Sequence, residues 1–429
     1  MNSAFINIWN KRVGAVMWDE EKKLAYFEYD KKFLKQGVSL SPIFLPNNQP
    51  NKVFYFPELA KSSTYKGLPG MLADLLPDKY GNTLINAWLA RNGRPANSMN
   101  PVEMLCFVGN RGMGALEFEP TSTNNENEST AIEIEGLIEI ASDILNERQD
   151  FSTKIAGDKE KALLDIIKIG TSAGGARAKA LIAYNPITNE VRSGQTIAPA
   201  GFSHWILKFD GVHDTQFGES YGFGRVEMAY ALMAKDCGIE MTECKLLEEN
   251  GRAHFMTKRF DRINNDEKIH MQSWCALSHV DFQEIGAHSY ESLFQTMRTL
   301  LLPYPDAEQM FRRMVFNIIG RNCDDHTKNF AFLMDKKGDW RLSPAFDVCY
   351  AYRPDSFWVS KQSITANGKR DHFTEEDLLK IANQMNIKKA KQIIDEVQNT
   401  INNWRVFAKE VNVNEKLIQE IDQNLLKIV

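Results

Sequence analysis

The most constraining feature of this chain is a polar segment, residues 322–329, that follows an apolar run of helical character. Within it, the carboxylate of Asp324 is followed five positions later by the amide of Asn329. A second carboxylate, Asp347, comes eighteen positions after that amide. In phosphoryl transfer, one carboxylate orients the acceptor hydroxyl, while an amide oxygen and a second carboxylate hold magnesium. The spacing therefore predicts a site for phosphoryl transfer.

Protein kinases use this spacing, D-x-x-x-x-N followed by an Asp on a nearby hairpin. The apolar run at residues 330–334, a polar turn and residues 340–342 predict such a hairpin here. The hairpin would return the chain and bring Asp347 beside Asn329. Two oxygen ligands suit magnesium, which keeps some of its waters and takes other ligands from phosphates.

Two other interpretations of this segment remain open. Asp324, Asp325 and Asn329 could cap turns, a common role for these residue types. His326 could bind a metal with its neighbouring carboxylates, although one histidine without a second in motif spacing is a weak signal for zinc. The second aspartate at hairpin distance favours phosphoryl transfer over both.

Composition limits the class of protein. The 429 residues suffice for two or three domains, and 43% hydrophobic with 25% charged residues is ordinary for a soluble globular chain. A net charge of −5 gives no basis for DNA binding through overall electrostatics. Six scattered cysteines without a C-x-x-C pair fit reduced thiols. Without a secretory signal pattern or a run of ~18 apolar residues, we expect a cytoplasmic protein with no membrane span.

The first region, residues 1–120, is predicted to be β-rich. It opens with two alternating strand-like runs joined by a hairpin turn at residues 10–12. A helix is expected over about residues 77–91, with Asp74 or Asp78 as its N-cap.

The remaining chain divides into three parts. Residues 121–130 contain no apolar residue and are predicted to be a linker. Residues 131–262 mix strands and helices, as in the N-lobe of a kinase, with one helix expected over about residues 132–147. Residues 263–429 are mainly helical, with one helix expected over residues 390–407. The predicted class is α+β, a protein-kinase-like bilobal fold with an extra N-terminal β-rich subdomain and an all-helical C-terminal lobe.

A glycine-rich segment precedes an apolar strand-like run at residues 180–184. It contains Gly174, Gly175, Ala176 and Arg177, and small residues let backbone amides approach a triphosphate closely. The segment matches neither the P-loop pattern nor the usual kinase G-x-G-x-x-G. A flexible turn is therefore the simpler interpretation of this segment alone.

Two further segments bear on nucleotide binding. Lys208 lies in an otherwise apolar strand and needs an anionic partner if buried, which an ATP phosphate would supply, with Glu227 on the next helix to position it. Either side chain could instead face solvent. At residues 254–262, backbone groups could bond an adenine edge while Phe260 packs on the ring. A core phenylalanine flanked by surface charges explains that segment equally well.

Taken together, these motifs resemble the HipA family of serine/threonine-protein kinase toxins from bacterial type II toxin–antitoxin systems. The resemblance covers almost the whole chain. Its motifs are residues 171–179, 206–209, 259–262, 322–330 and 342–347.

The resemblance implies a role for each site residue. Asp324 would be the catalytic base, Asn329 and Asp347 would hold Mg²⁺, and Lys208 would contact ATP phosphates. Ser172, in the glycine-rich loop, would be autophosphorylated, and the added charge beside the phosphate site would lower activity.

The resemblance also implies partners and shows two departures. Members pair with a small HipB-like helix-turn-helix antitoxin that binds DNA, and several phosphorylate an aminoacyl-tRNA synthetase, which slows growth. Residues 173–177 differ from the Val-x-Gly-x-Gln of many relatives, so loop conformation and substrate choice can differ. Lys258 stands where an acidic residue can occur, which affects the nucleotide contact expected there.

The favoured hypothesis is an ATP- and magnesium-dependent protein serine/threonine kinase that acts as a growth-arrest toxin. A catalytically silent nucleotide-binding co-repressor of an antitoxin is the first alternative. A small-molecule kinase, which shares the Asp…Asn…Asp layout, is the second.

Overall fold

The computed structural model describes residues 1–121, 177–194, 197–214, 218–219, 221–263 and 267–428, together with single positions or pairs between 132 and 170. These residues form two compact units. The first contains Met1–Leu40, Leu45–Gly224 and Lys245–Met271, and the second contains Ser41–Phe44, Arg225–Cys244 and Gln272–Val429.

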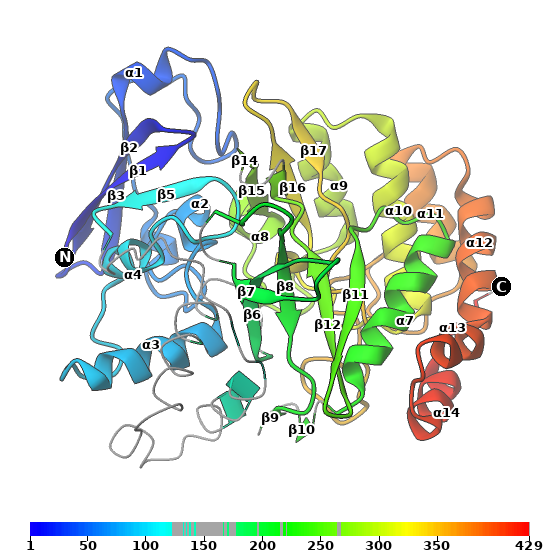
Figure 1. Cartoon of the computed structure of the whole chain (residues 1–429). Helices are drawn as coiled ribbons and strands as arrows, with labels where there is room; N and C mark the ends of the chain where they lie inside the picture. Colours follow the sequence, from blue (N-terminus) through cyan, green and yellow to red (C-terminus); the bar gives the residue numbers. More distant parts are fainter. Residues whose placement is uncertain are drawn as a thin grey trace. The chain divides into compact units, whose positions relative to one another are not determined.

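The first unit opens with a five-stranded antiparallel sheet of order β4-β3-β2-β1-β5 (Figure 1). Its strands alternate buried and exposed side chains, as a sheet with one covered face requires. Helix α4 (Pro101–Val108) packs against β1, β2 and β5. The strands are β1 (Ser3–Ile8), β2 (Lys11–Asp19), β3 (Leu24–Tyr29), β4 (Val53–Phe54) and β5 (Leu116–Glu119).

The first hairpin turns earlier than predicted. Trp9 and Asn10 both have positive φ, 48° and 60°, so the turn is a two-residue connection of the type that matches strand twist. The predicted position at residues 10–12 was wrong because the tryptophan, an unusual turn residue, was assigned to the strand.

The helix expected near residue 77 is α3 (Lys79–Arg91). The Asp78 carboxylate accepts a hydrogen bond from the backbone N–H of Gly81 over 2.7 Å, which confirms one of the two predicted caps. Three shorter helices complete this part of the unit: α1 (Lys31–Leu34), the 3₁₀ helix η1 (Pro57–Leu59) and α2 (Gly70–Ala73).

A second five-stranded sheet, of order β11-β12-β8-β6-β7, forms the strand-rich lobe. The described registers are antiparallel, and β8 lies between β6 and β12 (Figure 1). Position 224 requires glycine where the chain approaches β12, because a Cβ there would meet the carbonyl oxygen of Ala253 at 2.0 Å. The strands are β6 (Lys179–Tyr184), β7 (Val191–Ser193), β8 (Ser203–Lys208), β11 (Cys244–Glu249) and β12 (Arg252–Lys258).

Two short hairpins accompany this sheet. They are β9 (His213–Asp214) with β10 (Gly218–Glu219), and β13 (Arg262–Ile263) with β14 (Glu267–Lys268). The predicted linker at residues 121–130 lies outside the described residues after position 121, and so does most of the helix expected near residue 140.

The second unit is mainly helical and has a large apolar core that includes Tyr230, Trp274, Phe316 and Trp404. It also contains a small sheet of order β15-β16-β17. Its elements are α7 (Phe223–Asp236, from Arg225 on), β15 (His270–Ser273, from Gln272 on), α8 (Trp274–Ser278), α9 (Tyr290–Thr299), α10 (Tyr304–Ile319), η2 (Thr327–Asn329), β16 (Ala331–Met334), β17 (Trp340–Leu342), α11 (Glu375–Met385), α12 (Ala390–Asn402), α13 (Trp404–Glu410) and α14 (Glu415–Asn424).

One predicted helix is divided in two. The expected continuous helix over residues 390–407 breaks at Asn403, between α12 and α13. The break accompanies the burial of Trp404, whose indole N–H donates to the carbonyl of Ile418 at 3.1 Å and so joins α13 to α14. Helical periodicity alone did not reveal this tertiary contact.

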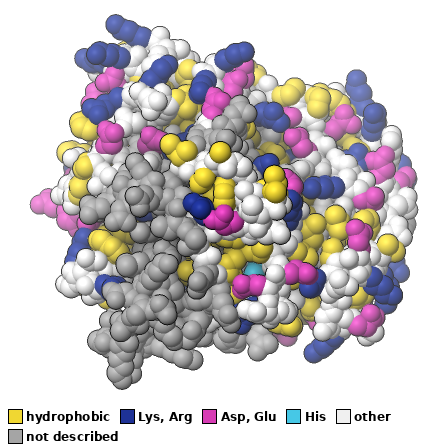
Figure 2. All heavy atoms as spheres, in the orientation of Figure 1, with side chains coloured by type: hydrophobic (Ala, Val, Ile, Leu, Met, Phe, Trp, Pro, Cys, Tyr) yellow, Lys and Arg dark blue, Asp and Glu magenta, His cyan; other side chains and the backbone are white. Residues whose placement is uncertain are grey.

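The surface agrees with the modest net charge. On the face drawn in Figure 2, basic and acidic side chains are interspersed among the described atoms. Within the described ranges, no helix is both long and apolar enough to span a bilayer.

Candidate active site

The loop that carries Asp324 begins where α10 ends. Arg321 has a positive φ of 54°, which turns the chain out of the helix. The Asp324 side chain is half exposed at 50%, and its Oδ1 lies 3.8 Å from His326 Nε2. Asn329 Nδ2 donates to the backbone carbonyl of Asp324 over 2.7 Å. The amide oxygen of Asn329 is thereby turned away from that carbonyl.

The predicted hairpin forms and returns the chain as expected. Strands β16 and β17 pair with Phe332 opposite Leu342. Beyond β17, Asp347 has a φ of 51°, a left-handed conformation that costs energy for a residue with a side chain. Asn329 and Asp347 line one small pocket in the second unit, which is the arrangement that the spacing predicted.

The pocket is lined by polar and apolar side chains from several elements. They are Ile239, Arg313, Asn317, Asn322, Asp325, Asn329, Phe330, Ala345, Phe346, Asp347 and Val348. The turn-capping interpretation does not account for two of these residues, Asn329 and Asp347, meeting at one pocket from segments on either side of the hairpin.

Arg313 is a pocket residue that sequence reasoning missed. It is buried on α10, and its guanidinium donates to the carbonyl of Ser343 over 2.7 Å. Burial lowers the pKa of Arg313 to about 10, so the group stays cationic at neutral pH. It thereby fixes the segment that leads to Asp347 and adds positive charge to the pocket wall. An arginine within the apolar run of α10 was the available signal.

Asp325 is the second missed residue, and it supports the loop from inside. Its buried carboxylate accepts hydrogen bonds from the Ser363 N–H at 2.7 Å, the Tyr290 hydroxyl at 2.7 Å and the Gln362 amide at 3.1 Å. Burial raises its pKa to about 6 despite these bonds, which favour the charged form. Asp325 therefore positions Asp324 by holding the adjacent backbone.

A short hydrogen-bond chain continues from this carboxylate to the loop backbone. Asn317 donates to the Tyr290 hydroxyl at 3.1 Å, and Asn322 donates to the Asn317 amide oxygen at 2.9 Å. Gln362 also donates to the Asn322 carbonyl over 3.1 Å. Because each buried amide is hydrogen-bonded, the loop has little freedom to shift.

In the first unit, two lysines oppose one another in the strand-rich lobe. Lys179 on β6 and Lys208 on β8 are directly paired in register. Opposed residues share a face of the sheet, and like charges directly opposite one another destabilise a sheet unless anions compensate. Asp78 is one such anion, with its Oδ2 3.6 Å from Lys179 Nζ. Lys208 Nζ also lies 5.7 Å from the ring centroid of Phe255.

The glycine-rich segment is described only from Arg177 onward. The Arg177 guanidinium stacks on the ring of Phe223 at 4.8 Å. Ser172, Gly174, Gly175 and Ala176 lie outside the described residues, so the predicted phosphate contacts and phosphorylation site stay predictions.

Glu227 is buried on α7 in the second unit, whereas Lys208 belongs to the first. Their predicted pairing therefore stays a prediction. Lys258 ends β12 opposite Trp205, and both Lys258 and Phe260 are partly buried. Their predicted adenine contacts likewise stay predictions.

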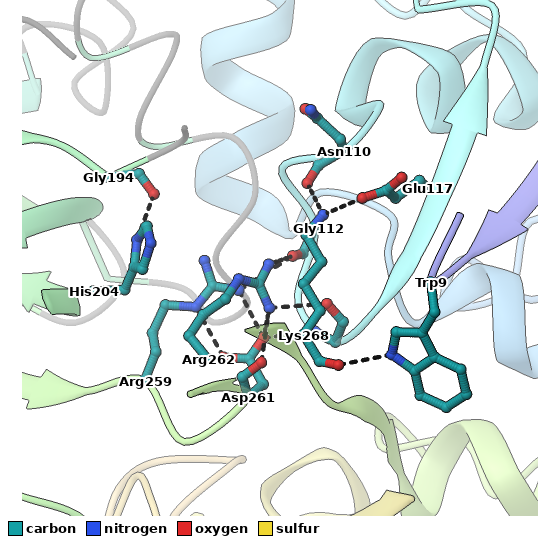
Figure 3. A network of polar contacts seen from close by, with 11 residues as sticks. Trp9, Asn110, Gly112, Glu117, Gly194, His204, Arg259, Asp261, Arg262 and Lys268 are labelled. Atoms are coloured by element: carbon teal, nitrogen blue, oxygen red, sulfur yellow. Dashed lines mark hydrogen bonds and ion pairs between the residues drawn. The ribbon is translucent and has the colours of Figure 1, made fainter. Parts of the chain in front are cut away.

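Around Phe260, the motif Arg259–Arg262 joins the strand-rich lobe to the opening module (Figure 3). Asp261 is fully buried and pairs with Arg259 and Arg262, each at 2.7 Å, and it accepts the Gly114 N–H at 2.7 Å. Both arginines also donate to the Gly112 carbonyl. Burial alone would raise the pKa of Asp261, but the two guanidinium groups hold it well below its usual range.

Lys268 makes a second connection to the opening module. Its ammonium donates to the Asn110 carbonyl and to Glu117, each over 2.7 Å, and its own carbonyl accepts from the Trp9 indole (Figure 3). The motif at residues 259–262 thus has a structural role, which its resemblance to a nucleotide-contacting segment did not reveal.

The donor set at the pocket fits magnesium. Asn329 and Asp347 offer one amide oxygen and one carboxylate, hard oxygen ligands of the kind Mg²⁺ takes while it keeps waters and phosphate oxygens. In the part of the chain that is described, no group of three or more His, Cys, Asp or Glu side chains is placed to hold a metal. The neighbours Asp324 and His326 belong to no such group.

Comparisons with known proteins agree with this architecture. A chain from the Shewanella oneidensis MR-1 toxin–antitoxin complex of HipA, HipB and operator DNA has a TM-score of 0.70 and 16% identity, covering 99% of this chain and 96% of that chain. This similarity shows a shared fold and confirms the predicted kinase-like α+β class. The Helicobacter pylori proinflammatory kinase CtkA has a TM-score of 0.38 and 13% identity over 59% of this chain and 90% of that chain, too weak to establish a common fold.

Sequence comparisons are more specific. Putative kinase Y4mE of Sinorhizobium fredii is 24% identical over 205 residues, 45% of this chain but only 42% of that protein. The HipA N-terminal domain matches residues 4–119, and the HipA-like C-terminal domain matches residues 171–404. The match to the HipA-like C-terminal domain alone spans more than half of this chain. The chain therefore belongs to the HipA family.

Proposed function

We propose that this chain is an ATP- and magnesium-dependent kinase that phosphorylates serine or threonine hydroxyls of a protein. The observation that supports it most is the arrangement of Asp324, Asn329 and Asp347. The Asn329 side chain donates a hydrogen bond to the backbone carbonyl of Asp324, and Asn329 and Asp347 line one pocket. Membership of the HipA family and the kinase-like fold support the same chemistry.

In this proposal the chain's own groups have distinct roles. The half-exposed Asp324 carboxylate orients the acceptor hydroxyl and accepts its proton. Asn329 and Asp347 would hold magnesium, which when bound neutralises charge on the nucleotide phosphates. Lys208 would contact those phosphates, and a bound triphosphate would offset the repulsion between Lys208 and Lys179.

The regulatory part of the proposal concerns Ser172 and the partners. Autophosphorylation of Ser172 would add roughly −1.5 to −2 charge beside the nucleotide phosphates and lower activity. A HipB-like helix-turn-helix antitoxin would be the partner, as HipB accompanies HipA in the Shewanella complex. The protein would thereby arrest growth as a toxin, with a translation component such as an aminoacyl-tRNA synthetase as its target.

Transfer of label from γ-labelled ATP tests this function. Wild type should label itself and a protein acceptor, and Asp324→Gln should abolish both. Asp339→Asn, which changes an exposed carboxylate in the β16–β17 turn, is the matched control and should behave as wild type. If neither wild type nor Asp324→Gln transfers label, the silent co-repressor is favoured. Transfer to a small alcohol but to no protein would favour a small-molecule kinase.

A further inference from the structure

Residues 352–361 form a loop that exposes two large aromatic side chains, and we call it the aromatic loop. Phe357 is 77% exposed and Trp358 is 38% exposed. Their rings pack edge to face with centroids 5.3 Å apart. Side chains of this kind dominate the energetics of protein interfaces, and exposed aromatic clusters mark interaction sites.

The aromatic loop is ordered by its own hydrogen bonds. Arg353 donates its backbone N–H to the Val359 carbonyl at 3.2 Å, and Ser356 donates to the Arg353 carbonyl at 3.1 Å. The Ser356 hydroxyl accepts from the N–H groups of Trp358 and Val359. The aromatic pair is therefore held in place before any partner binds, which lowers the entropic cost of binding.

The first end of the aromatic loop is bonded to the segment that carries Asp324. Ala351, directly before the loop, forms a parallel bridge with Asn322. Its N–H donates to the Arg321 carbonyl at 3.0 Å, and its carbonyl accepts from the Cys323 N–H at 3.1 Å.

The second end is bonded to the same segment. Ser363 donates from its hydroxyl to the Cys323 carbonyl at 2.9 Å and from its N–H to Asp325 at 2.7 Å. Gln362 donates to the Asn322 carbonyl at 3.1 Å. Both ends of the aromatic loop are therefore anchored on residues 321–325, the segment that bears Asp324.

We propose that the aromatic loop is the docking element for the protein that receives the phosphoryl group. This inference rests on the proposed function and narrows its substrate class. A small alcohol would gain nothing from an aromatic pair outside the pocket, whereas a polypeptide can place an apolar side chain on Phe357 and Trp358 while its hydroxyl reaches Asp324.

The charge of the aromatic loop further restricts which acceptor sequences complement it. The aromatic loop contains two cations, Arg353 and Lys361, and one anion, Asp355, and all three side chains are exposed. Its net charge of +1 complements an acidic residue near the apolar one in the acceptor. The acceptor segment therefore combines a serine or threonine with an apolar and an acidic neighbour.

A positional-scanning library of serine and threonine peptides tests the proposal. Wild type should prefer peptides with an apolar residue at one fixed offset from the hydroxyl. Phe357→Ser/Trp358→Ser should lose that preference and raise KM for the best peptide at least tenfold. The kcat and the thermal shift with MgATP should stay unchanged. Val406→Ser, which removes a 63% exposed apolar side chain on α13, should match wild type.

Two milder variants distinguish a loss of docking from misfolding of the double variant. Phe357→Ser alone changes the more exposed ring and should raise KM severalfold, and Trp358→Phe should keep most of the selectivity. Unchanged peptide selectivity in the double variant would overturn the docking proposal while leaving the kinase function intact. Transfer by wild type to small alcohols, with no peptide labelled, would overturn both.

Discussion

Asn329 donates a hydrogen bond from its side-chain amide to the backbone carbonyl of Asp324 over 2.7 Å. The residue proposed as a metal ligand therefore also positions the residue proposed as the base. The two roles use opposite ends of one amide group, because the nitrogen donates and the oxygen is left to coordinate. Substitutions at Asn329 can separate them.

Asn329→Asp keeps an oxygen for magnesium but cannot donate to the Asp324 carbonyl. We expect the thermal shift with MgATP to persist and kcat to fall about 10²-fold, the scale of a misplaced catalytic group. Asn329→Ala should lose both properties. The checks are thermal unfolding with and without MgATP and single-turnover transfer. Full activity of Asn329→Asp would show that the hydrogen bond does not align the base.

Asp347 has both a carboxylate charge and a left-handed backbone conformation, and different substitutions test the two properties separately. Asp347→Asn tolerates the φ of 51° but loses the carboxylate, so the thermal shift with MgATP should disappear while stability without nucleotide is kept. Asp347→Ala should lose the shift and also about 1 kcal/mol of unfolding free energy, because alanine is strained there. Equal stability of the two variants in denaturant titrations would contradict the strain argument.

Asp261 should be a strong determinant of stability in the first unit. Asp261→Asn would remove the charge that pairs with both guanidinium groups, Arg259 and Arg262, and breaking a buried pair in this way costs about 3–5 kcal/mol. Denaturant unfolding measures the loss, and limited proteolysis between the opening module and the strand-rich lobe locates it. Glu119→Gln, at an exposed ion pair, is the control and should change little. A loss below 1 kcal/mol would contradict the assigned role.

The sequence predicted those features that rest on local chemistry. The Asp78 cap, the β16–β17 hairpin and the meeting of Asn329 with Asp347 all follow from residue type and spacing. Such signals need only neighbours in the chain or one turn between them.

Features set by distant contacts were not predictable in this way. The break at Asn403 depends on the burial of Trp404 against α14. The structural role of Asp261 depends in part on a hydrogen bond from the N–H of Gly114, which lies 147 positions earlier. Asp325 resembled a turn residue because its partners, Tyr290, Gln362 and Ser363, lie 35 to 38 positions away in the sequence. One sequence contains no mark of which distant residues will meet.

Acid should destabilise the protein through buried histidines. Burial lowers the pKa of His254, His270 and His279 to about 4, below the unfolded value, so each contributes stability that is lost as pH falls from about 6.5 to 4. Asp325 acts in the opposite direction. Its pKa is raised to about 6, so it contributes stability that is lost as pH rises from about 4 to 6. Each group changes the unfolding free energy by at most about 1.4 kcal/mol per pH unit.

Since these three histidines outweigh Asp325, the unfolding free energy should fall between pH 6.5 and 4. Asp325→Asn removes the opposing contribution, so the fall should become steeper, and stability at pH 7 should also drop by about 1–3 kcal/mol from its mismatched hydrogen bonds. Denaturant unfolding at pH 7, 6 and 5 measures both effects. Asp355→Asn, an exposed carboxylate, should leave the slope unchanged. A shallower slope in Asp325→Asn would contradict the assigned pKa direction.

We expect the charge of Lys208 to serve nucleotide binding. It opposes Lys179 directly across β6 and β8, and like charges opposite one another destabilise a sheet by roughly 0.2–1 kcal/mol. Lys208→Met keeps the apolar stem and removes the charge, and with it the repulsion from Lys179. Because the contact to the phosphates is lost, the added stabilisation by MgATP should vanish.

Lys179→Met is the matched control, because it removes the other member of the same pair. It removes the ion pair with the partly buried Asp78 carboxylate, so it should lower stability without nucleotide. Differential scanning fluorimetry with and without MgATP compares the two. If Lys208→Met instead lowers the unfolding temperature and still responds to MgATP, Lys208 stabilises the sheet and does not bind the nucleotide.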